Sequence, residues 1–533
     1  MTGPTERDFP SLLTRISSRG DRTALSFYRG KTLGGRLTYA ELQARVDSLA
    51  AVFSKQGLGI GDRVAILAPN RLEVPVLVLA LLRIGAAVVP LNATSTEDDW
   101  AYILRHSGAR GLCTTRELGA RIAKEVLPHF TMFIEDALVE SAPPSTASDS
   151  APLDEAMAAV LYTSGTTGQP KGVVLRQRNL LSNAWSMARN FRLDGTTQYA
   201  VLPLYHAHAF GFGLMSALST GGHLVFSERL EPFTWAEVIR AESVEVTSVV
   251  PTLLPMLLAA RISKDKVPSL RHIMVSSAPL PRDLARDFQN KTGIPLIQGW
   301  GLSEYTNFAC CVSPAETAEE RERMMFDWEV PSIGPALEGT EVRILSGDPA
   351  AKKSALEGER GALEVRGHST MLGYFQDPDA TQRTIDEDGW LHTGDEGFFR
   401  VHGGRPIFFV TGRIKEIIIR DAEKYSPLKL EQRMIDAIPE LLGKWVVLGF
   451  PHRAHGEEVG AYLEIDVLDE TLKARIASAI EAMPVPERPK VIVFGPTPIP
   501  RTHTGKIQRR KLLPLFAPHF EHRGAVQFVN TIR

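Results

Sequence analysis

Residues 163–171, TSGTTGQPK, combine hydroxyl groups, glycines and a lysine in an order suited to binding phosphate. Consecutive backbone N–H groups in such a loop form an anion-binding concavity, and glycine permits the positive φ angles that it requires. The segment is not a Walker A loop, because Pro170 separates the glycine region from Lys171. The chain also lacks a GxGxxG fingerprint after a strand and a GxSxG elbow. Taken alone, the composition fits an ordinary surface turn about equally well.

Other motifs accompany this candidate phosphate loop along the chain. They are LTYAEL (37–42), LPLYHAHAFG (202–211), QGWGLSE (298–304), LHTGDEG (391–397), GRIKEIIIRDAEKYSP (412–427) and PRTHTGKIQRRKL (500–512). With these motifs the sequence resembles the adenylate-forming superfamily, and within it the acyl- and aryl-CoA synthetase branch of AMP-binding enzymes. The resemblance covers nearly the whole chain, and the order of the motifs makes it far more specific than any one of them.

The resemblance implies an ATP- and Mg²⁺-dependent ligase with two half-reactions. The first would join a carboxylic acid to the α-phosphate of ATP and release pyrophosphate, and the second would pass the acyl group from the acyl-adenylate to coenzyme A. Because an anion must approach a polyanion in the first step, the site needs positive charge, oriented N–H donors and little water.

The resemblance also assigns roles to particular residues. Lys506 would bridge the α-phosphate and the substrate carboxylate, Glu304 would ligate Mg²⁺, and Thr163 would begin the phosphate loop. Asp395 would accept hydrogen bonds from the ribose hydroxyls, with Arg413 assisting. The other expected ATP- and AMP-binding residues are Ser164, Gly165, Thr166, Thr167, Gly168, Lys171, Ser277, Ala278, Pro279, Gly299, Trp300, Gly301 and Ser303.

Each of these residues has a plain structural alternative. Asp395 would then only stabilise a turn, and Lys506 would be one more solvated cation in the basic segment 506–511. For either residue alone the plain alternative is favoured, but the ordered set of motifs outweighs it. Lys171 is a weaker candidate for a catalytic lysine than Lys506, because its role would only be to attract pyrophosphate.

The segment around His206 is expected to border the acyl pocket. The expected lining is His206, Ala207, Phe210, Gly211, Val250, Pro251, Ser276 and Asn307, together with Trp300. This lining is mostly apolar and favours a hydrophobic acid, whether fatty, aryl or bulky alicyclic. Relatives that activate α-amino acids carry an aspartate where this chain has Tyr205-His206, so an amino-acid substrate is not expected. His206 and His208 alternate as two metal ligands on a strand would, but no third ligand is evident nearby, so no metal is expected there.

The predicted hinge differs from the family pattern just after Lys415. Relatives usually read GGE there, and the second glycine lines the tunnel for the pantetheine arm of coenzyme A after the C-terminal domain rotates. This chain reads Asp421-Ala422-Glu423. A methyl group on Ala422 would narrow the tunnel and penalise positive φ by roughly 1–2 kcal/mol. Asp421 would place a negative charge near an anionic substrate.

This difference leaves alternatives open. In the first, the three residues are sequence variation in a surface turn without functional effect. In the second, the protein is an adenylation-only ligase that passes acyl-AMP to a carrier protein or a separate thioesterifying partner. A luciferase-like oxidative reaction is possible on the same fold, but no residue of this sequence points to it. The intact set of Glu304, Asp395 and Lys506 argues against an inactive nucleotide-binding scaffold. The sequence identifies neither the particular acid nor the oligomeric state, so a homodimer stays open.

The composition excludes several other classes of protein. The 533 residues are 44% hydrophobic with a net charge of -2, so neither nucleic acid nor an anionic membrane is an expected partner. Cys113, Cys310 and Cys311 form no CxxC spacing, which favours reduced thiols in a cytoplasmic protein. The N-terminus has no secretory signal pattern, and the apolar run 74–91 is interrupted by Arg83, which favours a buried helix and strand over a membrane span.

Alternating strands and helices must position these residues. Between about 37 and 410, strand-like runs such as RVAILAP (63–69) alternate with helical runs such as AELQARVDSLAAVFSKQ (40–56), and residues 140–152 read as an exposed connector. After 415, KWVVLGF, GAYLEID and KVIVFGP predict three strands, and Leu472, Ile476, Ile480 and Met483 share one helix face. We predict an α/β protein. Its large N-terminal domain, 1–414, would hold two sheets with helices plus a distorted β-barrel subdomain, and its small mobile C-terminal domain, 415–533, would be α+β and hinged at Lys415.

Overall fold

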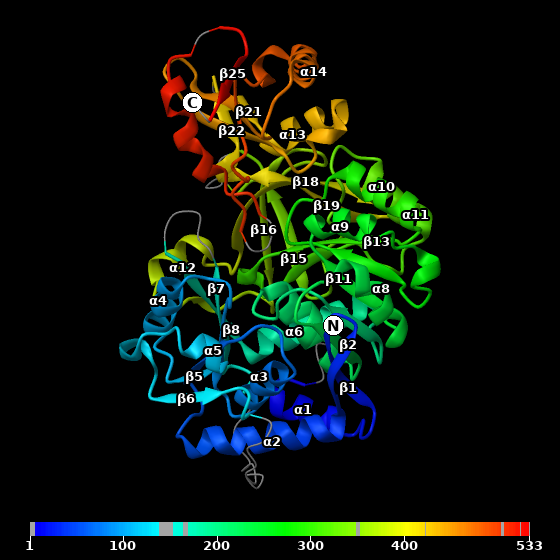
Figure 1. Ribbon diagram of the computed structural model, residues 1–533, viewed down its shortest axis with the longest axis vertical. Coiled ribbons are helices and arrows are strands. Elements are labelled where there is room, and N and C mark those ends of the chain that lie inside the picture. The colour runs from blue at the N-terminus through cyan, green and yellow to red at the C-terminus, as the bar shows by residue number, and fades with distance from the viewer. Residues whose placement is uncertain are drawn as a thin grey trace.

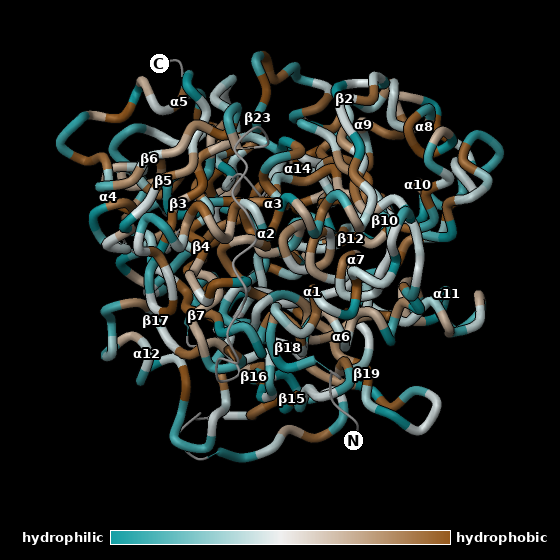
Figure 2. The backbone as a smooth tube through the Cα atoms, turned by 90° about the horizontal axis from the view of Figure 1, so that it is seen from below, coloured by the Kyte–Doolittle hydropathy of each residue, from teal (hydrophilic) through white to brown (hydrophobic). Residues whose placement is uncertain are grey.

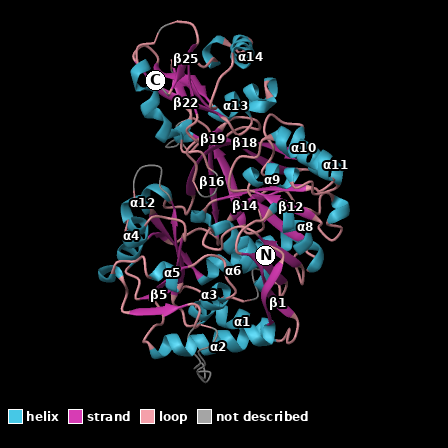
Figure 3. Ribbon diagram, in the orientation of Figure 1, coloured by secondary structure: helices cyan, strands magenta, loops and turns pink. Residues whose placement is uncertain are grey.

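The computed structural model describes residues 6–137, 153–163, 169–347, 352–421, 423–502, 506–522 and 524–531. Within these ranges the chain forms two large mixed sheets with helices, a curled half-barrel sheet and another sheet near the C-terminus (Figures 1 and 3). The predicted α/β fold class is therefore confirmed. The predicted connector 140–152 lies outside the described residues.

The first large sheet has the strand order β14-β13-β12-β11-β9-β10-β1-β2. Its inner pairs are parallel, and an antiparallel strand closes each edge. Parallel strands covered on both faces read as continuous apolar runs, as IMV at the end of β12 does. The strands are β1 (Thr23–Arg29), β2 (Thr32–Thr38), β9 (Thr197–Ala200), β10 (His223–Ser227), β11 (Val246–Val249), β12 (His272–Val275), β13 (Leu296–Gly301) and β14 (Phe308–Cys311).

The second large sheet has the order β17-β8-β7-β4-β3-β5-β6. The predicted strand in RVAILAP is β3, and the apolar run 74–91 forms a buried helix, α3, followed by the buried strand β4, as expected. The strands are β3 (Arg63–Leu67), β4 (Ala87–Leu91), β5 (Gly111–Thr114), β6 (Phe130–Phe133), β7 (Met157–Thr163), β8 (Lys171–Arg176) and β17 (Gly373–Tyr374).

Helices pack between and around these sheets. The main core joins apolar side chains of both sheets through α1, α2, α3 and α6, and Figure 2 shows hydrophobic segments concentrated inside and hydrophilic ones on outer loops. Helix α2 begins with a capping box between Thr38 and Glu41, which satisfies its first N–H groups. The helices are α1 (Phe9–Ser17), α2 (Tyr39–Lys55), α3 (Glu73–Arg83), α4 (Glu97–Ser107), α5 (Arg116–Gly119), α6 (Gln177–Phe191), α7 (Ser216–Ser219), α8 (Pro232–Ala241), α9 (Leu254–Ala259), α10 (Arg282–Thr292), α11 (Ala318–Phe326) and α12 (Pro378–Thr384).

The half-barrel sheet has the order β15-β16-β18-β19 and carries the longest strand of the described chain, β18. Its strands are β15 (Thr340–Leu345), β16 (Gly361–Gly367), β18 (Leu391–His402) and β19 (Arg405–Arg413). In Figure 1 the C-terminal sheet lies at one end of the molecule, beyond β18 and β19. The half-barrel therefore lies between the large sheets and the C-terminal sheet.

The C-terminal sheet pairs β21-β20-β23-β24-β25, with β22 also on β23. The three predicted strands are β22 (Trp445–His452), β23 (Gly456–Glu464) and β24 (Val491–Gly495), and α14 (Glu470–Glu481) buries Ile476 and Ile480 as expected. The sequence analysis missed β20 (Ile418–Arg420), β21 (Glu423–Tyr425) and β25 (Gln527–Asn530), because three or four residues are too few for a periodic pattern. Helix α13 (Pro427–Ala437) completes this region.

None of the helices in the described part of the chain is long and apolar enough to cross a membrane.

Candidate functional site

The predicted phosphate loop joins two antiparallel strands. β7 ends at Thr163 and β8 begins at Lys171, and these two residues are paired across the strands. The loop residues between them that the sequence analysis named, Ser164, Gly165, Thr166, Thr167 and Gly168, lie outside the described residues. The described stems therefore place Thr163 and Lys171 next to each other at the base of the loop.

Tyr374 links the base of the loop to Glu304. The Lys171 ammonium lies 5.0 Å from the centroid of the Tyr374 ring and 3.5 Å from Asp377 Oδ2. The Tyr374 hydroxyl donates to Glu304 Oε1 at 2.9 Å, and burial and the Glu304 carboxylate raise the pKa of Tyr374, so the phenol stays protonated as a donor. Glu304 thus lies at the base of the phosphate loop. Sequence reasoning missed Tyr374, because the two-residue strand β17 that carries it leaves no pattern.

Asp395 and Arg413 face each other between β18 and β19. They are paired directly, with Arg413 Nε 2.8 Å from Asp395 Oδ1, and Trp300 Nε1 donates to Asp395 Oδ2 at 3.0 Å. Asp395 is only 5% exposed, and burial raises its pKa. The charges of Arg413 and Lys506 act in the opposite direction. Three predicted site residues, Asp395, Arg413 and Trp300, therefore form one hydrogen-bonded group.

Lys506 lies on a short hairpin near the C-terminus. Thr502 N donates to Lys506 O at 2.7 Å, and Lys506 N donates to Thr502 Oγ1 at 3.1 Å. The hairpin is closed further by a bridge between Arg501 and Ile507. The backbone of Lys506 is therefore fixed by hydrogen bonds that do not involve its side chain.

The Lys506 side chain interacts with the carboxylates of the site. The side chain is exposed to solvent, yet desolvation by the surrounding protein and the Arg413 charge lower its pKa. The charges of Asp395, Glu304 and Glu416 act in the opposite direction. Segments far apart in the sequence thus bring a lysine and two of the predicted site carboxylates, Asp395 and Glu304, into one electrostatic environment.

The expected nucleotide wall lies where β12 and β13 end. Ser277 and Ala278 are half-buried and Pro279 is exposed, just after β12, while Gly299, Trp300 and Gly301 form the end of β13 and Ser303 begins the short helix η5 (Ser303–Tyr305). Ser277 adopts a φ of 72°, which is rare for a residue with a Cβ. Gly301 is required for another reason, because a Cβ there would lie 1.7 Å from the carbonyl oxygen of Asn307.

Replacement of Gly301 by alanine is expected to destabilise the protein by at least roughly 1–3 kcal/mol, because the added Cβ would force β13 and β14 apart. Thermal unfolding of the variant and the unchanged protein measures this difference. Gly59→Ala is the matched control, since its Cβ would meet nothing within 4 Å. Equal melting temperatures for Gly301→Ala and the unchanged protein would contradict the close approach.

The predicted acyl-pocket residues gather around a π-helix, η2 (Ala209–Met215). A π-helical turn is rare and frequently marks a functional site. A Cβ on Gly211 would lie 2.5 Å from Asn307 Nδ2, so the Asn307 amide packs directly against this glycine. Of the predicted lining, Phe210, Gly211, Val250, Pro251, Ser276 and Asn307 are buried, and His206 and Ala207 are partly exposed.

His208 is a buried histidine that the sequence analysis weighed only as a metal ligand. It precedes the π-helix rather than lying on a strand, so the alternation with His206 does not place the two rings on one face. Its Nδ1 lies 2.9 Å from Ser277 Oγ, and burial, aided by His206, lowers its pKa to about 3. The His208 ring is therefore neutral and connects the acyl-pocket segment to the nucleotide wall.

The predicted hinge region is described except at one position. Lys415 is exposed in the short helix η7 (Ile414–Glu416). Asp421 adopts a left-handed φ of 52°, which aspartate tolerates better than most residues with a Cβ. Ala422 lies outside the described residues.

Arg509 connects the hinge to the lysine hairpin, a contact the sequence analysis did not identify. It is buried and lies 2.7 Å from Glu416 Oε2, next to Lys415, and 2.8 Å and 3.0 Å from the two carboxylate oxygens of Glu431 in α13. Its Nε donates to Val447 O at 2.9 Å. Arg509, three residues after the lysine, thus binds the segment next to the hinge.

The three cysteines are buried in the fold. Cys113, Cys310 and Cys311 are all free and buried, and burial raises the pKa of each thiol. No disulfide joins these three residues in the structure.

Comparison with known proteins gives a consistent result. Residues 13–375 match the family described as AMP-binding enzyme. The sulfoacetate–CoA ligase of Cupriavidus necator is 30% identical over 496 residues, covering 90% of this chain and 92% of that protein. The oxalate–CoA ligase of Arabidopsis thaliana is 30% identical over 534 residues, covering 94% and 96%.

Solved structures agree with these sequence matches. The crystal structure of ATP-bound MatB from Rhodopseudomonas palustris superimposes with a TM-score of 0.83 at 27% identity, covering 96% of this chain and all of that one. The similarity therefore extends over the half-barrel and the C-terminal sheet as well as the two large sheets.

Proposed function

The chain belongs to the AMP-binding enzyme family, and we propose that it activates a hydrophobic carboxylic acid with ATP and transfers the acyl group to coenzyme A. This family is that of the AMP-forming acid–CoA ligases. In the first step an oxygen of the acid attacks the α-phosphorus of ATP, and the bond to pyrophosphate breaks. In the second step the thiol of coenzyme A loses its proton and attacks the acyl carbon, and AMP leaves.

The observation that carries this proposal is the common electrostatic environment of Lys506, Asp395 and Glu304. Arg413 and Trp300 hold the Asp395 carboxylate in one orientation. In that orientation it can accept hydrogen bonds from the ribose hydroxyl groups. Lys506 supplies a mobile point charge that can neutralise both the incoming carboxylate and the α-phosphate. The lysine charge screens the repulsion between the carboxylate and the α-phosphate, so the activation barrier of the first step falls.

Glu304 suits a Mg²⁺ ion that the nucleotide carries. Mg²⁺ prefers one or two carboxylates together with phosphate oxygens, and Tyr374 fixes Oε1 of Glu304 through one hydrogen bond. The ion, when bound, neutralises charge on the phosphates. Thr163 and Lys171, at the base of the loop, would contact the same phosphate groups.

The substrate class is proposed from the lining around the π-helix. Ala207, Phe210, Gly211, Val250 and Pro251 are apolar, and apolar lining with a few polar groups is typical of sites for hydrophobic ligands. The polar residues His206, Ser276 and Asn307 would orient the acid. The relatives named above act on sulfoacetate and oxalate, so these two small acids are the natural comparison for a hydrophobic substrate.

We further divide the chain at Lys415 into a domain of residues 1–414 and a C-terminal domain of residues 415–533 that rotates between the half-reactions. The separate apolar cores of the C-terminal sheet support this division. Rotation would remove Lys506 once the adenylate has formed and admit the thiol. An adenylation-only ligase remains the second candidate, because Ala422 replaces the glycine that relatives usually carry.

One experiment tests the reaction and the substrate class together. The enzyme is incubated with Mg-ATP and a panel of fatty, aryl, alicyclic, oxalic and sulfoacetic acids, with and without coenzyme A, and the products are identified by mass. We expect acyl-AMP from a hydrophobic acid without coenzyme A and the acyl-CoA thioester with it. Preference for oxalate or sulfoacetate would contradict the proposed substrate class, and no adenylate with any acid would contradict the activity.

The same assay separates the two candidates for the second step. Acyl-AMP that persists unchanged in the presence of coenzyme A would favour the adenylation-only enzyme. In that case Ala422→Gly is expected to restore thioester formation, because glycine removes the methyl group and permits positive φ. If this variant also fails to form the thioester, the Ala422 methyl group is not what prevents the second step.

A further inference from the structure

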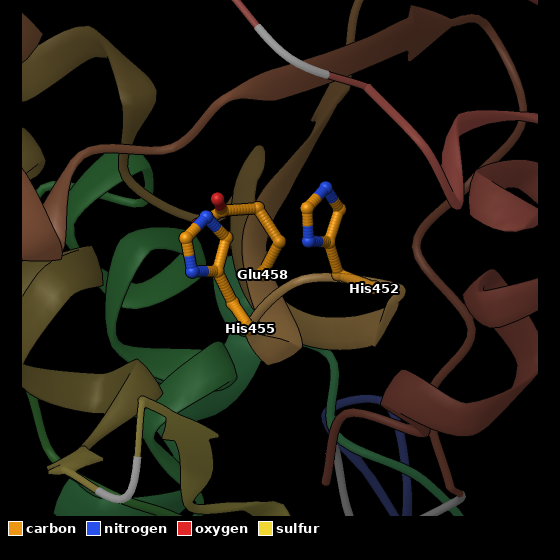
Figure 4. Close-up of side chains that lie close together, drawn as sticks. All are labelled: His452, His455 and Glu458. Carbon is orange, nitrogen blue, oxygen red and sulfur yellow. The ribbon is translucent and has the colours of Figure 1, made fainter.

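A compact cluster of two histidines and a glutamate lies in the C-terminal sheet, apart from the nucleotide site. His452 ends β22, His455 lies in the following turn, and Glu458 lies in β23. One ligand atom of each residue lies within 4.8 Å of the others, and Figure 4 shows the two rings and the carboxylate gathered around one hairpin. His452 and Glu458 are each 3% exposed.

Each histidine has one ring nitrogen bound to an oxygen outside the cluster. His452 Nε2 lies 3.0 Å from the carbonyl oxygen of His522, and His455 Nδ1 lies 2.8 Å from Asp421 Oδ1. Metal-binding histidines almost always donate their second N–H to a carbonyl or carboxylate in this way, which fixes the tautomer and orients the ring. The remaining nitrogens, Nδ1 of His452 and Nε2 of His455, are then acceptors. Ala454 N donates to His452 Nδ1 at 3.3 Å, and a metal ion would replace this contact.

From this arrangement we propose that His452, His455 and Glu458 bind a divalent transition-metal ion of the zinc type. Two imidazoles and one carboxylate are a known donor set for Zn²⁺, and three protein ligands leave a fourth position for water or an added ligand. Zinc bonds of about 2.0–2.2 Å require neighbouring ligand atoms roughly 3.3 Å apart, so ligand atoms that now lie up to 4.8 Å apart must draw together by as much as about 1.5 Å.

The charges around the cluster are compatible with a cation. Arg420 Nε lies 2.7 Å from Glu458 Oε1, and Val459 N donates to the same oxygen at 2.9 Å, so a metal would use Oε2. Asp421 adds a second carboxylate through His455. The two carboxylates and Arg420 leave a net negative charge, which a divalent cation would reverse.

The cluster lies between two turns of the C-terminal sheet, so a bound metal would join them. Asp421 precedes Ala422 in the turn between β20 and β21, while the ligands belong to the hairpin of β22 and β23. Asp421 N also donates to His455 O at 3.1 Å. A bound metal would therefore fasten the turn at the proposed pantetheine tunnel to the neighbouring hairpin.

The test is a metal titration of the full chain, freed of any histidine tag and treated with a chelator. Calorimetry with Zn²⁺ is expected to give one saturable site per chain, and Co²⁺ is expected to give the visible absorption of a tetrahedral site. His455→Gln and Glu458→Gln are expected to abolish both signals. Asp421→Asn is expected to weaken binding by about 10–100-fold, because asparagine tolerates the left-handed φ but removes the carboxylate.

The control is His129→Gln, an exposed histidine of the N-terminal part, which should bind the metal as the unchanged protein does. His455 is partly exposed, so His455→Gln should keep its melting temperature in the absence of metal, which separates ligand loss from unfolding. The proposal is overturned if the unchanged protein shows no saturable binding. Equal binding by the unchanged protein, His455→Gln and Glu458→Gln would overturn it as well.

Discussion

Substitution of Lys506 by alanine is expected to lower the rate of acyl-adenylate formation by about 10²-fold or more, the cost typical of removing one preorganised charge. The charges of Asp395 and Glu304 act on the lysine, which the proposed mechanism places where the two anions meet. Its exposed side chain and its hydrogen-bonded hairpin indicate that the fold will not change. ATP–pyrophosphate exchange with the best acid of the panel measures the effect.

Lys511→Ala is the matched control, because Lys511 is an exposed cation of the same basic segment. Its exchange rate should equal that of the unchanged protein. Thioester formation from added acyl-AMP and coenzyme A should also survive in Lys506→Ala, since the proposed mechanism uses the lysine only in the first step. Near-normal adenylation by Lys506→Ala would remove this residue from the mechanism.

Substitution of Glu304 by glutamine is expected to lower adenylation by on the order of 10²-fold and to raise the Mg²⁺ concentration needed for half-maximal rate. Glutamine keeps the shape and an acceptor for the Tyr374 hydroxyl, so the change is confined to the charge. A Mg²⁺ titration of the exchange rate gives both quantities.

Glu319→Gln serves as the control for Glu304→Gln. The side chain of Glu319 is 74% exposed on α11 and should leave the Mg²⁺ titration unchanged. An unaltered Mg²⁺ requirement in Glu304→Gln, with or without a slower rate, would show that the carboxylate does not hold the ion.

Long apolar runs made most of the fold predictable from the sequence. The run 74–91 had to be a buried helix and strand, and the structure has α3 and β4 there. Burial on both faces gives such strands their continuous apolar character, and this signal needs no knowledge of neighbours. The strands β20, β21 and β25 were missed, because three or four residues are too few for a periodic pattern. β20 and β25 also pair with β23 and β24, which lie far along the chain.

The contacts within the site were less predictable than its residues. The motifs indicated Asp395, Arg413 and Glu304, but not that Tyr374 donates to Glu304 or that Arg509 binds Glu416. These contacts join residues 70 and 93 positions apart, and neither has a sequence spacing that would reveal it. The alternation of His206 and His208 indicated a shared strand face, whereas packing placed them at the start of a π-helix.

The contacts of Arg509 have a consequence for the order of events during turnover. A buried guanidinium shared by Glu416 and Glu431 is costly to leave unpaired, so the three residues move as one piece. Lys506 is only three residues from Arg509, so in the proposed domain rotation the lysine would move together with the segment next to the hinge. The lysine would then leave the site only when the hinge turns. Intermediate positions of the domain, in which water would reach the acyl-adenylate, would therefore be short-lived.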